Sequence, residues 1–184
     1  MKVYIKYNSK KYPAPETEKE LNRTARLWRR NAQAKLRREN ANASGVLKSS
    51  MKTRLGMNGD QPFADITPNV SYWEFIDKGV QGAQLNPFRR QNESPFKYKS
   101  KKPPLDMILK WMTVKPIRGR GKDGKFIKKE SAAYLIQRSI WSRGIRPLFF
   151  ISDTGKRIEK KYADSIAQAY ALDLENALEN SLKG

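Results

Sequence analysis

Apolar residues recur at intervals of three and four positions in four parts of this chain, the pattern of helices that bury one face. The first predicted helix runs from Pro15 to Asn40, and glutamates gather at its positive N-terminal end. Its apolar stripe comprises Leu21, Ala25, Trp28, Ala32 and Leu36. The last predicted helix begins at a cap on Ser152 or Asp153. Its stripe comprises Ile158, Tyr162, Ile166, Ala169, Tyr170, Leu174 and Leu178.

Two shorter helices are predicted between these two. Pro103 and Pro104 precede the first of them, which carries Trp111 beside an apolar face formed by Leu105, Ile108, Leu109 and Met112. The second is predicted over residues 131–143, with Ser131 as its N-cap. One of its faces comprises Ala133, Ile136, Gln137 and Ile140.

The end of that second helix is marked by glycine and proline. Gly144 suits the position after a helix, and Pro147 prevents any continuation. The apolar residues Leu148, Phe149, Phe150 and Ile151 follow at once. We expect Phe149 to pack inside the protein and Phe150 to face a partner.

Short alternating segments predict a small sheet. Val3, Ile5 and Tyr7 alternate with polar residues and predict a first strand. A β-hairpin is predicted over residues 59–78, with its turn at Thr67-Pro68-Asn69 and its end at Gly79 and Gly82. A short helix is predicted around Val46, Met51 and Leu55.

The segments between these elements are long and polar. Residues 81–103 and 115–129 are predicted as extended loops, and loops of this length are commonly functional. The prediction is a single α+β domain over residues 1–184. A small antiparallel sheet is packed by the long N-terminal helix, the two central helices and the long C-terminal helix.

The composition excludes several classes of site. The chain has no cysteine and no histidine, which rules out disulfides, zinc sites built on these residues and histidine-based catalysis. No run approaches the ~20 apolar residues of a membrane span. We therefore expect no cofactor, no metal, no membrane partner and synthesis in the cytoplasm.

The net charge of +20 is unevenly distributed. Residues 1–58 hold 15 Lys/Arg against 4 acids, and residues 101–130 hold 10 against 3. Residues 59–100 are balanced at 5 against 5, and residues 131–184 hold 8 against 6. Two basic blocks of this kind attract polyanions, nucleic acid above all. Solubility, or an acidic partner subunit, would also account for them.

Specific positions within these blocks are candidates for contact with DNA or another anionic partner. Gly119, Gly121 and Gly124 match the spacing of a dinucleotide-binding loop, but the flanks lack the strand and helix that such a site needs. A flexible basic loop is the better interpretation. The first helix also carries a basic face. The candidates are Arg118, Arg120, Lys122, Lys125, Arg89, Arg90, Arg30 and Arg37.

Acidic and aromatic residues give two further hypotheses. Asp60, Asp65, Glu74 and Asp77 could serve a magnesium-dependent nuclease, but Glu74 and Asp77 would point to opposite faces of a strand. Charges that protect an edge strand are the better interpretation.

Among the aromatics, we expect Phe75 to be internal. The predicted subunit interface comprises Trp73, Phe150, Arg143 and Arg146.

An ordered set of motifs resembles the neck and tail-completion proteins of tailed bacteriophages, which join head to tail. The set comprises Tyr72–Val80, the Pro-Pro-Leu helix start at 103–105, Asp-Gly-Lys-Phe-Ile at 123–127, Ala-Tyr-Leu-Ile at 133–136 and Gly-Ile-Arg-Pro-Leu-Phe-Phe at 144–150. The resemblance implies a non-enzymatic virion subunit in a homo-oligomeric ring around packaged double-stranded DNA. Portal, adaptor or tail proteins would lie above and below the ring. The alternatives are a monomeric basic nucleic-acid-binding protein and a metal-dependent nuclease.

Overall fold

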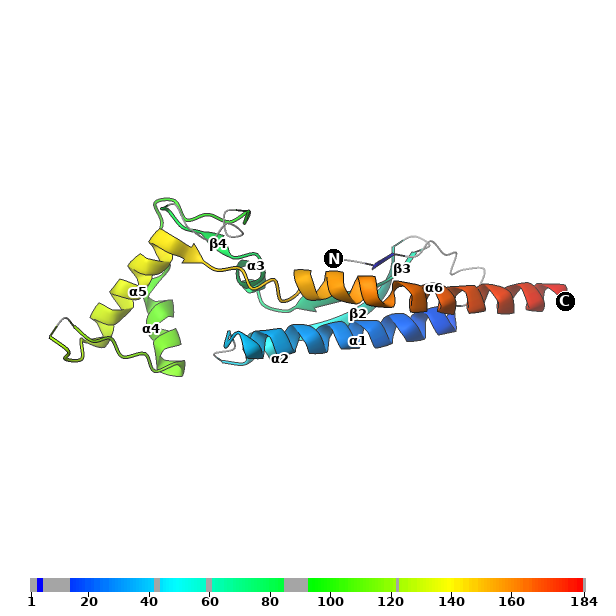
Figure 1. Cartoon of the computed structure of the whole chain (residues 1–184), viewed down its shortest axis with the longest axis horizontal. Helices are drawn as coiled ribbons and strands as arrows, with labels where there is room; N and C mark the ends of the chain where they lie inside the picture. The colour runs from blue at the N-terminus through cyan, green and yellow to red at the C-terminus, as the bar shows by residue number, and fades with distance from the viewer. Residues whose placement is uncertain are drawn as a thin grey trace. The chain divides into compact units, whose positions relative to one another are not determined.

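A computed structural model describes residues 3–4, 14–41, 44–58, 61–84, 93–121 and 123–183. The fold is α+β, as predicted, with a long helix near each end of the chain (Figure 1). The elements in chain order are β1 (Val3–Tyr4), α1 (Pro15–Arg38), α2 (Val46–Ser49), β2 (Met51–Asn58), β3 (Gln61–Pro68), α3 (Trp73–Asp77), β4 (Val80–Gln81), α4 (Leu105–Val114), α5 (Lys129–Arg143), β5 (Gly144–Ile145) and α6 (Ser152–Leu182).

The chain divides into two compact units. The α1–α6 unit comprises Met1–Arg38, Leu47–Asn69 and Phe150–Gly184, and the α4–α5 unit comprises Glu39–Val46 and Val70–Phe149. Each unit has its own cluster of buried apolar side chains. The sequence analysis predicted a single domain and no such division, because the chain enters each unit more than once and the sequence pattern shows no boundary.

Helices α1 and α6 pack side by side with the β2–β3 hairpin along α1 (Figure 1). The predicted stripe of α1 is confirmed, since each of its members is at most 3% exposed: Leu21, Ala25, Trp28, Ala32 and Leu36. The Trp28 indole Nε1 donates to the Ile151 carbonyl at 3.2 Å and to Thr154 Oγ1 at 3.1 Å. The predicted caps on Ser152 and Asp153 are wrong, because Ile151 holds the N-cap position without a side-chain hydrogen bond.

The sheet of this unit has the strand order β1-β3-β2, and both pairings are antiparallel. The hairpin therefore lies over residues 51–68, earlier than predicted, and Met51 and Leu55 belong to β2 instead of a helix. Gly56 leaves room for the Phe63 ring of β3, which lies 2.8 Å from where a Cβ would be. The tertiary pairing with β3 thus overrides the weak helical pattern over residues 51–55, whereas residues 46–49 form the predicted short helix as α2.

Residues 73–77 form helix α3, where the sequence analysis predicted the second hairpin strand. Apolar residues spaced over five positions fit either period, so a short run cannot distinguish a helix from a strand. The carbonyls of Ile76 and Asp77 accept hydrogen bonds from Leu148 N at 3.1 Å and Phe149 N at 2.8 Å. These bonds satisfy the end of α3, where carbonyls lack partners within the helix.

The core of the α4–α5 unit lies between these two helices. Ile108 and Met112 of α4 pack against Ala132 and Ala133 of α5. Helix α5 begins at Lys129, so Ser131 is not its N-cap. Gly144, at φ 81°, ends the helix as predicted.

Strands β4 and β5 form a second, two-stranded antiparallel sheet in this unit. Gly79 and Gly82 therefore bracket β4 instead of ending a longer strand. Tyr98 N donates to the Gln81 carbonyl at 2.9 Å. Burial raises the pKa of the Tyr98 phenol above its usual value.

Candidate functional site

The outer surface of α1 carries a straight row of cations, which we call the arginine face. Its members follow one another at helical intervals of four, three, four and seven residues, so they lie on one side of the helix. All five side chains are exposed: Lys19, Arg23, Arg26, Arg30 and Arg37. At 1.5 Å per residue the row is roughly 27 Å long. The buried apolar stripe on the opposite side of α1 fixes the direction of this row.

The middle and end of the arginine face are free of carboxylates from α1 itself. Lys19 pairs with Glu16 at 3.1 Å, and Arg23 pairs with Glu20 at 3.2 Å. Within the described parts of the chain, no ion pair is recorded for Arg26, Arg30 or Arg37. Their guanidinium groups each present several N–H donors in a fixed fork that matches phosphate oxygens.

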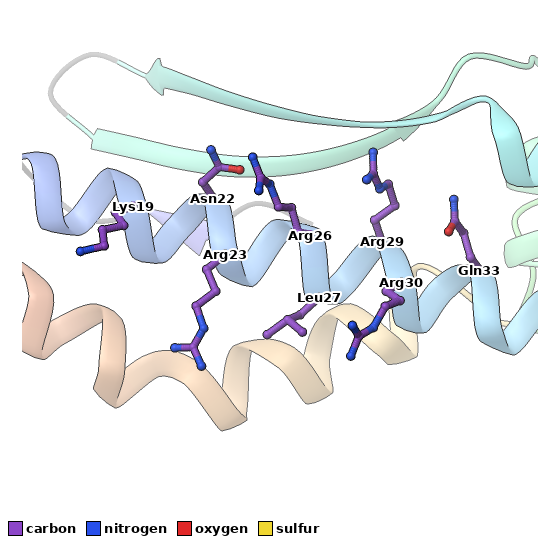
Figure 2. Close-up of a pocket in the computed structure, with 8 residues that line it drawn as sticks. All are labelled: Lys19, Asn22, Arg23, Arg26, Leu27, Arg29, Arg30 and Gln33. Carbon is purple, nitrogen blue, oxygen red and sulfur yellow. The ribbon is translucent and has the colours of Figure 1, made fainter.

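An open groove of about 650 Å³ follows this face, and Figure 2 shows the side chains that line it. Arg26 and Arg29 extend toward the β2–β3 hairpin and Arg23 extends toward α6 (Figure 2). All lining residues come from α1 alone. A small-molecule site needs walls from several elements. This surface suits the extended backbone of a polyanion better than a compact ligand.

The second candidate is the Phe126 loop, residues 115–128 of the α4–α5 unit. Arg120 and Phe126 form an antiparallel bridge. The Arg118 and Arg120 guanidinium carbons lie 5.7 and 4.8 Å from the centre of the Phe126 ring. Phe126 is 58% exposed, and Lys125 is also exposed. The loop therefore presents cations around an accessible aromatic ring, a combination found where proteins stack on nucleic-acid bases.

The glycines of this loop form a tight turn rather than a phosphate cradle. Gly121 N donates to the Lys125 carbonyl at 2.8 Å, and Gly124 N donates to the Gly121 carbonyl at 3.0 Å. A dinucleotide site needs such N–H groups for the pyrophosphate and a helix that opens on the glycines. Here both N–H groups are used within the turn, and α5 begins only at Lys129. The geometry thus argues against a dinucleotide site, and the contact of this basic loop with an anionic partner stays a prediction.

The other predicted cations are placed differently. Arg146 Nη2 pairs with Glu39 Oε2 at 2.7 Å, so part of its charge is already compensated inside the α4–α5 unit. Arg143 is exposed, and its Nε donates to Ser139 Oγ at 3.1 Å. Arg89, Arg90 and Lys122 lie outside the described residues.

Burial corrects part of the predicted aromatic interface. Phe150 is 0% exposed and belongs to the core, whereas Phe75, predicted to be internal, is 41% exposed. The Phe75 ring meets Phe96 edge to face at 4.5 Å. Phe149 has a left-handed backbone conformation, with φ at 48°, so the chain changes direction between Phe149 and Phe150. Trp73 is partly buried and stays a candidate for a subunit contact.

The acidic residues considered for a nuclease belong to different units of the chain. Asp65 pairs with Arg54 at 3.5 Å and accepts from Thr67 Oγ1 at 3.0 Å, in the α1–α6 unit. Glu74 pairs with Lys78 at 3.1 Å on α3, and Asp77 is 1% exposed. The expected edge-strand role for Glu74 and Asp77 is wrong because both lie on a helix. Asp60 lies outside the described residues. In the part of the chain that the structure describes, no three acidic side chains converge as metal ligands would.

No protein-family model, curated protein or solved structure matches this chain. The resemblance to phage neck and tail-completion proteins therefore stays a hypothesis carried by the ordered motifs. None of the helices within the described ranges is both long enough and apolar enough to cross a bilayer.

Sequence reasoning missed two parts of these surfaces. Lys19 and Arg29 are further cations that line the groove, and the spacing of Lys19 from Arg23 could have placed it on the same face. The exposed ring of Phe126 was not singled out either. Its position among Arg118, Arg120 and Lys125 was the available signal.

Proposed function

We propose that this chain is a non-enzymatic structural subunit of a bacteriophage neck, which assembles into a ring and contacts packaged DNA or a neighbouring ring through basic surfaces. The arginine face is the observation that carries the proposal. It is a rigid row of exposed cations, and three of them have no recorded ion-pair partner among the described residues. A second cationic surface, the Phe126 loop, lies in the other unit.

The chemistry of both surfaces fits binding without sequence preference. Guanidinium groups that meet phosphates position a duplex but carry no base information. Such binding weakens steeply with salt because each neutralised phosphate releases condensed counterions. A protein that surrounds moving DNA needs contacts of this kind, since they do not depend on the base pair that is passing.

Assembly into a ring is supported by apolar side chains that each unit leaves exposed. Residues such as Met107 at 58%, Val114 at 52% and Leu178 at 64% face outward on helices. Single exposed apolar residues are normal on monomers, but rows of them on helices indicate contact with other protein. A monomeric nucleic-acid-binding protein is the second candidate. The same cations would bind nucleic acid in a monomer, but a monomer gives the exposed apolar side chains on the helices no role.

Sedimentation of the full-length chain separates the two candidates. The ring proposal predicts discrete multimers that grow with protein concentration and persist in salt high enough to release DNA. A chain that sediments as a monomer at every concentration, with and without a short duplex, and still binds the duplex at low salt would overturn the ring and favour the monomeric alternative. Magnesium-dependent nicking of plasmid, lost in Asp65→Asn, would contradict both.

A further inference from the structure

The end of α6 continues past the point where this helix is fastened to α1. The Asp173 carboxylate is 4% exposed and accepts from Thr17 N at 2.8 Å in the first turn of α1. Beyond Asp173, α6 runs on past the start of α1 (Figure 1). Its leucines become steadily more accessible: Leu174 is 39%, Leu178 is 64% and Leu182 is 86% exposed. Spaced by four residues, these leucines form one apolar row, which we call the leucine row.

Helix α4 carries a second exposed row, on the side away from its packed face. Ile108 and Met112 pack against α5, while Met107, Trp111 and Val114 are 58%, 38% and 52% exposed. These three residues follow one another at intervals of four and three positions, so they share one side of the helix. We call them the α4 row.

The two rows have similar lengths and differ in the charges beside them. From first to last residue, the leucine row spans roughly 12 Å and the α4 row roughly 10.5 Å at the helical rise. Glu175 and Glu179 lie along one flank of the leucine row. Lys110 lies exposed on one flank of the α4 row, on the same side as Asp106. Lys115 follows the last residue of α4, and its Nζ donates to Asn40 Oδ1 at 3.2 Å. Each row is therefore an apolar strip. Two carboxylates border the leucine row, and the Lys110 ammonium group borders the α4 row.

We propose that the leucine row of one copy docks on the α4 row of a neighbouring copy. This contact rests on the ring assembly proposed above and specifies the surfaces that would form it. Because the two surfaces differ, every copy offers one and accepts the other. A head-to-tail contact of this type closes into a ring when its rotation permits. One contact buries few residues, so the closed ring rather than an isolated pair is the stable form.

Charge favours docking of the leucine row on the α4 row of a neighbouring copy over the symmetric pairing of two α6 ends. Residues 162–182 hold four acids and no Lys or Arg in a chain of net charge +20. Two such ends brought together would place Glu175 and Glu179 near their own copies. The pairing of Glu179 with Lys183 at 3.3 Å offsets little of this, since both side chains are more than half exposed. The α4 row has Lys110 beside it, so docking there avoids bringing the four glutamates of two α6 ends together.

Disulfide trapping tests the contact directly, because the chain has no cysteine of its own. Leu182→Cys is introduced in a tagged copy, and Met107→Cys or Val114→Cys is introduced in an untagged copy. These positions are at the ends of the rows, so a parallel docking brings one pair within disulfide reach and an antiparallel docking brings the other. Under mild oxidation, one of the two mixtures should give mixed dimers, and the tag identifies them by mass.

Two results would overturn the docking. In the first, Leu182→Cys cross-links to itself in preference to either partner, which indicates the symmetric pair. In the second, neither mixture cross-links although the unmodified chain is multimeric.

A substitution pair separates this proposal from the ring proposal itself. Leu178→Gln should weaken self-association about tenfold or more, the order expected when a buried leucine is removed from an interface. Leu135→Gln on α5, where the leucine is 54% exposed, is the matched control and should assemble as the unmodified chain does. If Leu178→Gln also assembles normally, the docking is wrong and the ring stands. If the unmodified chain never forms multimers, both proposals fail.

Discussion

The carboxylate of Asp173 caps helix α1 through Thr17, although 156 residues separate the two in sequence. Its oxygens accept from Thr17 N at 2.8 Å, Thr17 Oγ1 at 2.7 Å and Glu16 N at 3.1 Å. The first N–H groups of a helix have no partner within it, and a negative charge there also favours the helix dipole. One side chain of α6 thus fixes where α1 begins and where the free end of α6 starts.

Replacing this cap should destabilise the α1–α6 unit. Asp173→Asn replaces a carboxylate with two acceptor oxygens by an uncharged amide with one, so a buried N–H donor of α1 loses its acceptor. We expect a loss of roughly 1–3 kcal/mol in the free energy of unfolding. Asp164→Asn is the control, because Asp164 is an exposed carboxylate on the same helix. Its effect should stay within about 0.5 kcal/mol. Urea unfolding of both variants measures the difference, and equal losses would contradict the role of the cap.

The long-range nature of this cap shows what could and could not be predicted from the sequence. The stripe from Leu21 to Leu36 was predicted correctly, because a periodic pattern over many residues has only one helical interpretation. The contact between Thr17 and Asp173 leaves no local signal. The same limit explains the free end of α6. Leu174 and Leu178 continue the apolar pattern of that helix. The pattern does not reveal that α1 starts too late to reach and cover these two leucines.

Short segments were ambiguous for a different reason. Residues 72–76 are rich in the aromatic and β-branched residues that favour a strand, and the bonds from Leu148 and Phe149 are made to the end of a helix instead. Which of Phe149 and Phe150 is buried depends on the backbone turn at φ 48°, which composition does not indicate. The basic face of α1 was predicted from charge and periodicity alone, since exposed cations on a periodic helix need no tertiary information.

The burial of Phe150 leads to a prediction that separates folding from assembly. Phe150→Ala removes a fully buried ring and should cost roughly 3–5 kcal/mol in the free energy of unfolding. Trp73→Ala, at a partly buried position, should lower multimer formation more than it lowers stability. Thermal unfolding and sedimentation of the two variants, measured side by side, test this contrast. Parallel loss of stability and assembly in Trp73→Ala would remove Trp73 from the proposed interface.

The close approach of Gly82 to the end of α5 predicts a position that excludes any side chain. A Cβ at Gly82 would lie 2.2 Å from the Ser142 carbonyl oxygen and 2.5 Å from the Arg143 carbonyl carbon. Gly82→Ala should therefore destabilise the α4–α5 unit by roughly 1–3 kcal/mol or more. Gly45→Ala is the control, because Gly45 has open space around it and only its positive φ of 79° opposes a side chain. If the two variants unfold at the same urea concentration, the close packing of Gly82 is not a constraint.

The arginine face predicts a change in the salt dependence of DNA binding, beyond a simple loss of affinity. Arg26→Gln with Arg30→Gln removes two exposed cations that have no recorded ion pair among the described residues. If each meets one phosphate, the slope of log K against log salt should fall by about 0.9 per contact, or roughly 1.8 for the pair. Fluorescence anisotropy of a labelled duplex over a series of salt concentrations measures this slope. Arg157→Gln with Lys160→Gln removes the same net charge from exposed positions on α6 and should leave the slope nearly unchanged. Equal slopes in the two double variants would show that net charge, and not this row of arginines, governs binding.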